Sequence, residues 1–177
     1  MIGQAALFLE PIAGVYPIGM REANQLLARW EHKLGPINRP FHSEAYALLL
    51  DQRPIAVAVS TSIVHGPVAG YARQEVVELG RLCAEPGNTW ANRVLLRLWR
   101  EACAPRWQCW PVRAAISYSH NAMHRGELYR HDGWRRVKDD CGSAGGGLWS
   151  RPREQGQAVY GKKTLWVWAF PILAEAM

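Results

Sequence analysis

Two segments of the chain have apolar residues at helical spacing, which predicts two amphipathic helices. The first covers residues 21–35 and ends at Gly35-Pro36. The second covers residues 88–104, where Asn88 or Thr89 can cap the start. The apolar stripes are Leu26, Leu27, Trp30 and Leu34 in the first segment, and Val94, Leu95, Leu98 and Ala102 in the second.

Strand-like runs fill much of the remaining chain. We expect strands in residues 5–13, 71–86, 110–119 and 164–170, and a hairpin in residues 43–64 that turns at Asp51-Gln52-Arg53-Pro54. A short helix within residues 120–134 should end at Gly133 in a left-handed conformation. Antiparallel strands followed by a βαβ unit predict an α/β (α+β) fold with a mixed central sheet and helices on both faces.

The length of 177 residues and the 49% hydrophobic content fit one domain over residues 1–177. The net charge is +6 and arginine supplies most of it, which favours a polyanionic partner and is equally compatible with an ordinary basic protein. The four cysteines form no CxxC pair, and the first residues have neither a basic signal-peptide region nor a membrane-spanning length. We therefore expect a cytoplasmic protein with reduced thiols and no membrane contact.

The most specific sequence pattern lies between residues 76 and 137. "VVELGRLCAEPGNTWANRVLLRL" is followed by "AAISYSHNAMHRGELYRHDGWRRV", and the pair resembles the acyl-CoA N-acyltransferase (GNAT) superfamily. In that fold a strand, a pyrophosphate-binding loop with its helix, and a further strand precede an Asn-containing helix with a Leu-Tyr-x-x-x-Gly-Phe/Trp motif. The resemblance implies a GNAT-like mixed sheet and an acyl-type donor. The residues that match the last motif are Asn121, Leu128, Tyr129, Gly133 and Trp134.

The cofactor loop departs from the superfamily pattern. Counting from Pro86, Thr89, Asn92 and Val94 stand where the superfamily has Gln or Arg and then small residues. Acetyl-CoA is thus a candidate donor, although the loop expected to bind it diverges from the superfamily pattern.

A narrower resemblance covers the same segments together with a basic, Gly-rich stretch at about residues 138–163. The combination of "ELGRLC", "NRVLLRLWREA", "AISYS" and "LYRHDGW" is similar to the Mom family of phage DNA-modification proteins. That family converts adenine in phage DNA to an N6-carbamoylmethyl form and so protects the DNA from host restriction. The resemblance implies a transferase acting on double-stranded DNA in the host cytoplasm, with iron as an associated metal.

Four residues are candidates for catalysis. Tyr129 matches the superfamily tyrosine that commonly acts as general acid toward the leaving group or as an orienting donor, and a phenol can donate at neutral pH. A core tyrosine on the short helix is the alternative. Glu78 lies on the strand that carries the general base in many members, although it could equally be a solvent-facing carboxylate. Arg81 could hold the donor phosphate or carbonyl, or could pair with Glu78 or Glu85. Ser119, at the end of its strand, could hydrogen-bond the donor or a base.

The start of the second helix predicts a phosphate site, because free N–H groups and the helix dipole attract anions there. The candidate cofactor-binding residues are Asn88, Thr89, Arg93 and Asn121.

Basic residues around the Gly-rich stretch are candidates for phosphate contacts with DNA. They are Arg135, Arg136, Lys138, Arg151, Arg153, Lys162 and Lys163. A solvated loop without a partner is the alternative.

The metal ligands stay unassigned. Iron needs a cluster of histidine and carboxylate ligands, and the candidates are His42, His65, His120, His124 and His131 with Glu44, Glu75 and Glu78. Two alternatives to DNA modification remain at this point: an ordinary N-acyltransferase for a small amine or peptide, and a non-catalytic nucleic-acid-binding module.

Overall fold

The computed structural model describes residues 13–39, 42–64, 66–141 and 162–171. The strands are β1 (Ala13–Ile18), β2 (Ser43–Leu50), β3 (Arg53–Thr61), β4 (Val76–Ala84), β5 (Ala114–His120), β6 (Arg135–Cys141) and β7 (Lys163–Ala169). The helices are α1 (Met20–Arg29), α2 (Trp90–Leu98) and α3 (Glu127–His131). Within these ranges no helix has the length and apolarity needed to cross a membrane.

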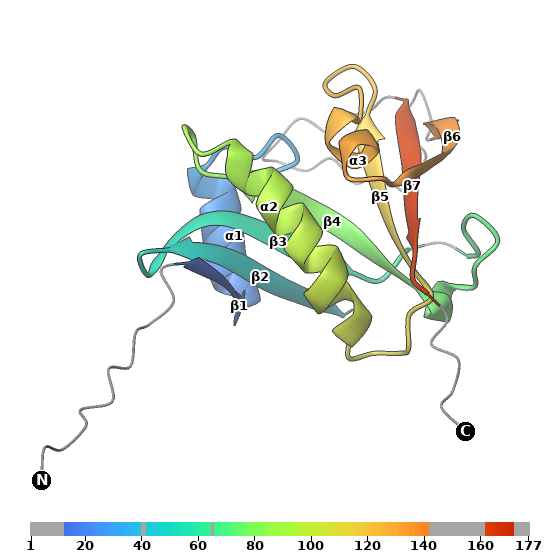
Figure 1. Cartoon of the computed structure of the whole chain (residues 1–177), viewed down its shortest axis with the longest axis horizontal. Coiled ribbons are helices and arrows are strands. Elements are labelled where there is room, and N and C mark those ends of the chain that lie inside the picture. Colours follow the sequence, from blue (N-terminus) through green and yellow to red (C-terminus); the bar gives the residue numbers. More distant parts are fainter. Residues whose placement is uncertain (1–12, 40–41, 65, 142–161, 172–177) are drawn as a thin grey trace, which may run out of the picture.

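The strands form one mixed sheet in the order β1-β2-β3-β4-β5-β7-β6. The β4–β5 pair is parallel, and the other neighbours in the sheet are antiparallel. Helix α1 covers one face, and α2 and α3 lie on the other (Figure 1). The expected mixed sheet with helices on both faces is thus confirmed.

Each face of the sheet has its own core. Leu27 of α1 and Trp30, the residue after this helix, pack with Val57 and Val59 of β3. On the opposite face, α2 packs on β3 and β4 and is joined by a group of aromatic side chains. The residues buried on this side of α2 and its continuation are Ala91, Leu95, Leu96 and Trp99.

The β2–β3 hairpin forms at the expected turn. Asp51 and Gln52 connect the strands, and both have positive φ, 48° and 61°. Two such residues in succession are typical of a type I′ turn, whose twist matches that of the flanking strands. The turn residues therefore set the register of the pairs next to the turn, up to the shift between Leu49 and Leu48.

Several predicted boundaries are wrong. Strand β1 covers Ala13–Ile18, where no strand was expected beyond Ala13, while the strand expected in residues 5–13 lies outside the described ranges except for that residue and stays a prediction. Helix α1 ends at Arg29 instead of continuing to Gly35, and Leu34 is 36% exposed beyond it. Neither Asn88 nor Thr89 makes a side-chain capping bond at the start of α2.

Two further corrections concern the pattern of burial and one strand. Val94 and Leu98, predicted to lie on the buried stripe, are 39% and 38% exposed, because the sheet contacts a face of α2 rotated from the expected one. The segment after Trp134, in which no strand was expected, begins with strand β6 on the edge of the sheet. Its sequence, RRVKDDC, has no apolar alternation that would predict a strand.

Candidate functional site

Strands β4 and β5 separate after three residue pairs. The parallel ladder joins Val76 with Ala114, Val77 with Ala115 and Glu78 with Ile116, and no later pair is formed. The β3–β4 register shifts between the Val59–Arg81 and Ser60–Leu79 pairs, which leaves Gly80 as a bulge on β4. A bulge bends the strand that carries it. The edge of β4 that faces β5 is therefore open beyond Glu78.

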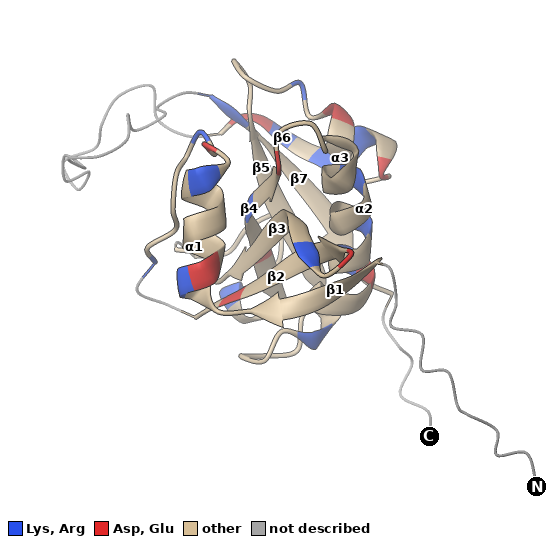
Figure 2. Cartoon of the chain, turned by 90° about the vertical axis from the view of Figure 1, so that its left-hand side faces the viewer, with Lys and Arg blue, Asp and Glu red and all other residues tan. Residues whose placement is uncertain are grey.

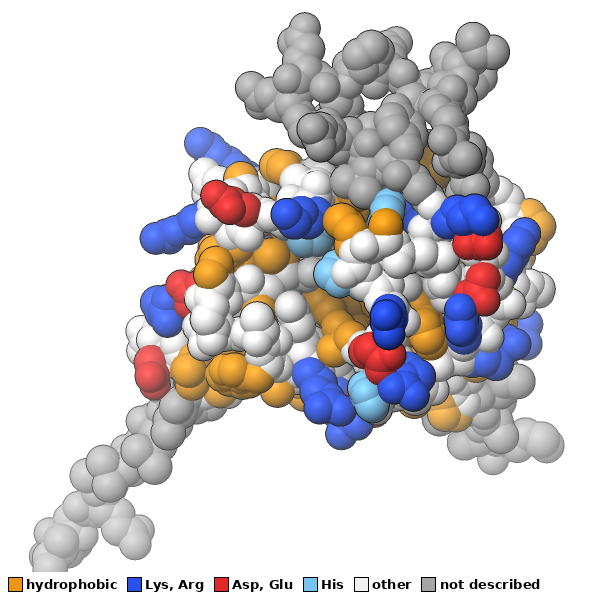
Figure 3. Space-filling model, turned by 90° about the horizontal axis from the view of Figure 1, so that it is seen from above, with side chains coloured by type: hydrophobic (Ala, Val, Ile, Leu, Met, Phe, Trp, Pro, Cys, Tyr) orange, Lys and Arg blue, Asp and Glu red, His pale blue; other side chains and the backbone are white. Residues whose placement is uncertain are grey.

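A cavity of about 730 Å³ lies in this opening, a size typical of small-molecule sites. It is lined by β4, β5, the segment after α1, the start of α2 and the segment leading into α3. Viewed from this end, hydrophobic side chains lie in a hollow among histidine and basic side chains (Figure 3). The basic side chains that line it are Lys33, Arg39, Arg81, Arg125 and Lys163.

Tyr129 reaches the cavity from α3 and is held there by β5. Its phenolic oxygen lies 2.8 Å from Ser117 Oγ. Ser117 Oγ also donates to the Leu79 carbonyl at 3.2 Å. Because a serine hydroxyl has one hydrogen, the phenol is the donor of the Tyr129–Ser117 bond. Two consecutive hydrogen bonds thus join α3, β5 and β4 beside the point where β4 and β5 separate.

An aromatic group surrounds the Tyr129 ring. Trp166 stacks on it with ring centroids 5.7 Å apart, and Trp134 meets it edge to face at 5.4 Å. Burial raises the pKa of Tyr129, nearby Glu78 adds to the rise, and the ability of Ser117 to donate to a phenolate opposes it. The phenol is therefore neutral at physiological pH and keeps a proton that it can donate.

Glu78 forms a two-pronged ion pair with Arg39. The two terminal nitrogens of Arg39 donate to the two carboxylate oxygens of Glu78 at 2.7 and 2.8 Å. Arg39 also donates to the Ser62 carbonyl at 3.0 Å. Glu78 is 8% exposed, so the solvent-facing interpretation of this residue is wrong. The carboxylate lies at the cavity wall, where the acceptor oxygens keep further lone pairs.

Arg81 lines the cavity but is bonded to the backbone. Its guanidinium donates to the carbonyls of Gly35 at 3.0 Å and of Leu34 at 3.3 Å, which holds the segment after α1 against β4. Glu78 and Glu85, the two partners considered for it, pair with Arg39 and Arg53. Its contact with a donor stays a prediction.

Ser119 also lines the cavity. Its hydroxyl accepts a hydrogen bond from the Trp166 indole at 2.9 Å, and the residue is 4% exposed. This bond fixes the indole that stacks on Tyr129, so Ser119 positions the ring group around the phenol.

The predicted cofactor residues divide into two sets. Thr89 lines the cavity at the start of α2, together with Asn92, which sequence reasoning assigned no role. Asn88 donates to Glu85 at 2.8 Å, and Arg93 is an exposed residue of α2 outside the lining. Asn121 accepts from Thr164 at 2.9 Å and donates to Asp140 at 3.2 Å, so it joins the end of β5 to β6 and β7.

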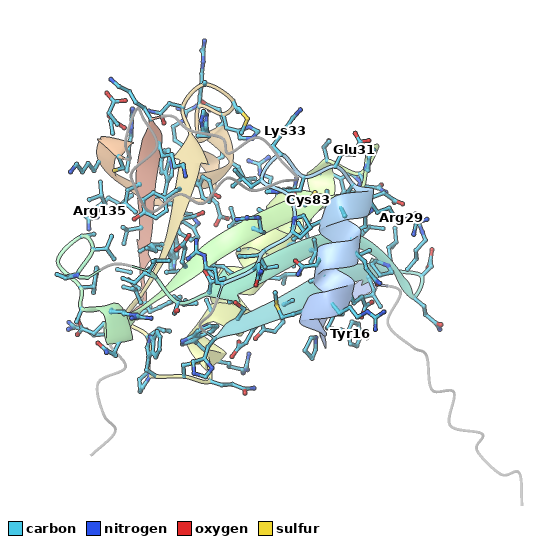
Figure 4. All side chains as sticks on the ribbon, turned by 180° about the vertical axis from the view of Figure 1, so that it is seen from behind. Tyr16, Arg29, Glu31, Lys33, Cys83 and Arg135 are labelled. Atoms are coloured by element: carbon cyan, nitrogen blue, oxygen red, sulfur yellow. The ribbon has the colours of Figure 1, made fainter. Side chains whose placement is uncertain are left out.

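The predicted basic cluster is only partly brought together. Lys163 lines the cavity, while Lys162 pairs with Asp140 and Arg136 pairs with Asp139. Lysine and arginine are spread over several elements (Figure 2). Arg135 lies at the opposite end of the molecule from Arg29 and Glu31 (Figure 4). Lys138 is an exposed residue of β6, and Arg151 and Arg153 lie outside the described residues.

Histidines gather at the cavity, but the described part of the chain holds no group of three His, Cys, Asp or Glu residues that could bind a metal. His32, His120 and His124 are lining residues. Burial, Arg81 and His124 lower the pKa of His32 to about 4, so its ring is neutral at physiological pH. The residues described therefore do not fit the iron implied by the resemblance; His65 lies outside them.

Sequence reasoning missed two residues of the site, Ser117 and Arg39. Ser117 could have been found, because it shares a strand face with Ser119, and Tyr118 is the exposed residue between them. Arg39 lies in a segment without periodicity, so no local signal pointed to its pairing with Glu78.

No protein-family model and no curated protein matches the chain. Solved structures do. An acetyltransferase from Thermus thermophilus is 16% identical with a TM-score of 0.54, and the match covers 90% of this chain and 98% of that one. A GNAT family acetyltransferase from Elizabethkingia anophelis with acetyl-CoA bound is 12% identical, with a TM-score of 0.53 and coverage of 91% and 100%.

A third structure, Arabidopsis thaliana NAA60 in complex with a bisubstrate analogue, is 12% identical with a TM-score of 0.58, and coverage is 90% and 99%. At such identities the likeness concerns the arrangement of the backbone. Together with the sheet order and the split between β4 and β5, it shows that the chain has a GNAT-like fold.

Proposed function

We propose that the protein is a transferase that moves an acyl-type group from a CoA thioester to the exocyclic N6 amine of adenine in DNA. The observation that carries the transfer chemistry is the neutral, half-buried phenol of Tyr129, held by Ser117 at the point where β4 and β5 separate. The acceptor rests on the resemblance of the sequence to the Mom family. The carbamoylmethyl group of that family is not an acyl group, so forming it would take either an unusual donor or further chemistry after acyl transfer.

The open edge of β4 supports a thioester donor. Arg81, Leu82, Cys83 and Ala84 line the cavity on the side where no strand pairs with β4. An extended chain with amide groups, such as the pantetheine arm of CoA, can hydrogen-bond to an unpaired strand edge. Asn92 Oδ1 is buried at the same cavity with no hydrogen-bond partner in the described structure, and an amide N–H would satisfy it.

The phosphate end of the donor would meet a looser site. Gly87 has φ +90° with open space where a Cβ would stand, so backbone can be approached there. The basic side chains at the cavity wall, Lys33 and Arg125 among them, suit an anionic ligand. The open backbone at Gly87 and the basic side chains thus suit the phosphates of a CoA ester, even though the loop lacks the small residues of the superfamily pattern.

A CoA thioester supplies an activated acyl carbon and a thiolate leaving group. The amine nitrogen forms a bond to that carbon as the carbon–sulfur bond breaks. Tyr129 gives its phenolic proton to the departing sulfur, and Ser117 can turn its hydroxyl from the Leu79 carbonyl to the phenolate. The proton lost by the amine goes to the carboxylate of Glu78, which lines the same cavity as Tyr129.

An adenine acceptor requires access to the cavity. In duplex DNA the N6 amine is paired, and enzymes that act on a base extrude it into a pocket. The net charge of +6 favours DNA through its phosphates, an attraction that weakens strongly with salt.

The test combines two measurements on the full chain. Nucleosides from DNA of cells that express the protein are analysed by mass spectrometry, with a Tyr129→Phe variant as the matched control. Purified protein is tested in parallel for thermal stabilisation by acetyl-CoA. A heavier adenine nucleoside with the wild type and none with the variant supports the proposal, and the mass identifies the group transferred.

The other outcomes separate the alternatives. Stabilisation by acetyl-CoA with unmodified DNA and transfer to small amines points to an ordinary N-acyltransferase. Salt-dependent DNA binding that the Tyr129→Phe variant retains, with no product of any kind, points to a non-catalytic nucleic-acid-binding module.

A further inference from the structure

Tyr118 presents an aromatic ring to the cavity from the face of β5 opposite to Tyr129. Successive residues of a strand point to opposite faces of the sheet. Ser117, the residue before Tyr118, contacts the Tyr129 phenol, so Tyr118 points to the other face. On the Tyr118 face, Ala114 and Ile116 are fully buried among Val76, Leu165 and Val167. Tyr118 continues this face beyond the last β4–β5 pair, and it is 37% exposed.

The separation of the strands explains this exposure. Tyr118 pairs with Leu165 of β7 on one side of β5. On the other side, β4 has turned away after Glu78, so the described structure gives the ring no cross-strand neighbour there. An exposed ring at a cavity wall is unusual for a residue in the middle of a sheet, where neighbouring strands normally cover it.

Glu78 pairs across the sheet with Ile116, two positions before Tyr118, so the Arg39–Glu78 ion pair lies on the Tyr118 face of the sheet. The charges of Glu78 and Arg39 both act on the Tyr118 phenol: burial raises its pKa, Glu78 raises it further, and Arg39 opposes the rise. The carboxylate can accept an N–H through its remaining lone pairs. The cavity therefore has a flat apolar surface next to a hydrogen-bond acceptor, on the side of the sheet away from Tyr129.

We propose that Tyr118 is the stacking platform for the acceptor: the adenine ring lies on the Tyr118 ring and directs its exocyclic amine to the Glu78 carboxylate, which Arg39 orients. This inference rests on the proposed function and assigns the two halves of the cavity. The Tyr118 side receives the planar base, and the Tyr129 side receives the thioester. A base that stacks on an aromatic ring gains affinity whatever its sequence context.

The experiment compares Tyr118→Leu with Tyr118→Phe. Leucine keeps apolar volume on the strand but removes the flat ring, and phenylalanine keeps the ring without the hydroxyl. A matched control is Tyr16→Ala, since Tyr16 is 43% exposed on β1 and does not line the cavity. The substrate is a 20-base-pair duplex with adenines in varied contexts, and modified nucleoside is measured as a function of DNA and of acetyl-CoA concentration. Melting temperatures confirm that each variant is folded.

We expect Tyr118→Leu to raise the KM for DNA by about tenfold, as loss of one stacked base implies. The KM for acetyl-CoA and the kcat at saturating DNA should stay within about threefold, while Tyr118→Phe and Tyr16→Ala behave like the wild type. Leucine that performs as well as phenylalanine overturns the stacking role, and so does phenylalanine that fails as badly as leucine. If the wild-type protein modifies no adenine, the proposed function fails instead, which the wild-type arm alone reveals.

Discussion

The phenolic oxygen of Tyr129 lies 2.8 Å from Ser117 Oγ, and the Ser117 hydroxyl donates a hydrogen bond to the Leu79 carbonyl. This chain joins α3 to the two strands at their point of separation. It gives the phenol a fixed direction and a partner that can stabilise the phenolate after proton donation. Two catalytic predictions depend on it.

Tyr129→Phe removes the proton but keeps the ring that packs against Trp134 and Trp166. We expect kcat to fall by roughly 100-fold or more, the usual contribution of a positioned acid, with donor affinity unchanged. Steady-state kinetics and calorimetric binding of CoA check the two parts. Ser117→Ala should give a smaller loss of kcat, about tenfold, since a hydrogen bond to a charged group is lost while the acid remains. Equal losses in the two variants would contradict this division of roles.

The raised pKa of Tyr129 predicts its titration in the folded protein. The pKa values of Tyr46 and Tyr118 are raised as well, so tyrosinate absorbance followed with pH should show several tyrosines that ionise above the ordinary value of about 10. The Tyr129→Phe difference spectrum should identify the contribution of Tyr129. Because the folded pKa is raised, the contribution of this residue to stability is complete below about pH 10 and is lost as pH rises through the folded pKa. A group that ionises below pH 9 and disappears in the variant would contradict the assignment.

The lowered pKa of His32 predicts that the protein loses stability as the pH falls, whereas Tyr129 predicts a loss as the pH rises. Its pKa is lowered from 6.5 to about 4, so the unfolded chain takes up the proton before the folded protein does. The contribution of His32 to stability is complete above pH 6.5 and is lost as pH falls to about 4. In His32→Asn the melting temperature should fall less between pH 6.5 and 4 than in the wild type.

The buried Arg100–Asp132 pair predicts a large effect on stability. Arg100 Nε donates to Asp132 at 2.6 Å, its guanidinium lies 3.8 Å from the Trp168 ring centroid, and both charged side chains are at most 6% exposed. Asp132→Asn would leave the buried Arg100 cation with only the largely exposed Glu101 carboxylate as its partner, so unfolding should become easier by about 3 kcal/mol. Denaturant titration measures this difference. In the exposed Arg136–Asp139 pair, Asp139→Asn should change stability by less than about 1 kcal/mol.

Gly126 links backbone conformation to the site. Its φ is +73°, and a Cβ there would overlap the Trp166 indole that stacks on Tyr129. We expect Gly126→Ala to lower the melting temperature and to reduce transfer activity together, because the indole and the start of α3 must shift. Gly19→Ala, at a position with φ −68° and no atom within 4 Å of the added Cβ, should have the wild-type melting temperature and activity.

The sequence by itself determined the element order, the β2–β3 turn and the left-handed end of α3 at Gly133. These features follow from local periodicity and from residues that favour particular backbone conformations, so neighbouring residues suffice to predict them. It also placed Tyr129 beside the end of β5. The edge strand β6 escaped prediction because a polar strand on a sheet edge has no alternating pattern.

The tertiary structure decided which side chains meet. Arg39 lies 39 positions before Glu78, and Ser117 lies 12 before Tyr129, so no periodic pattern could pair them. The bulge at Gly80 and the separation of β4 from β5 open the cavity, and these depend on the whole sheet. Local sequence sets conformation within a few residues, whereas contacts across the sheet arise only when distant segments pack together. For that reason the elements were predictable and the partners of Glu78 and Tyr129 were not.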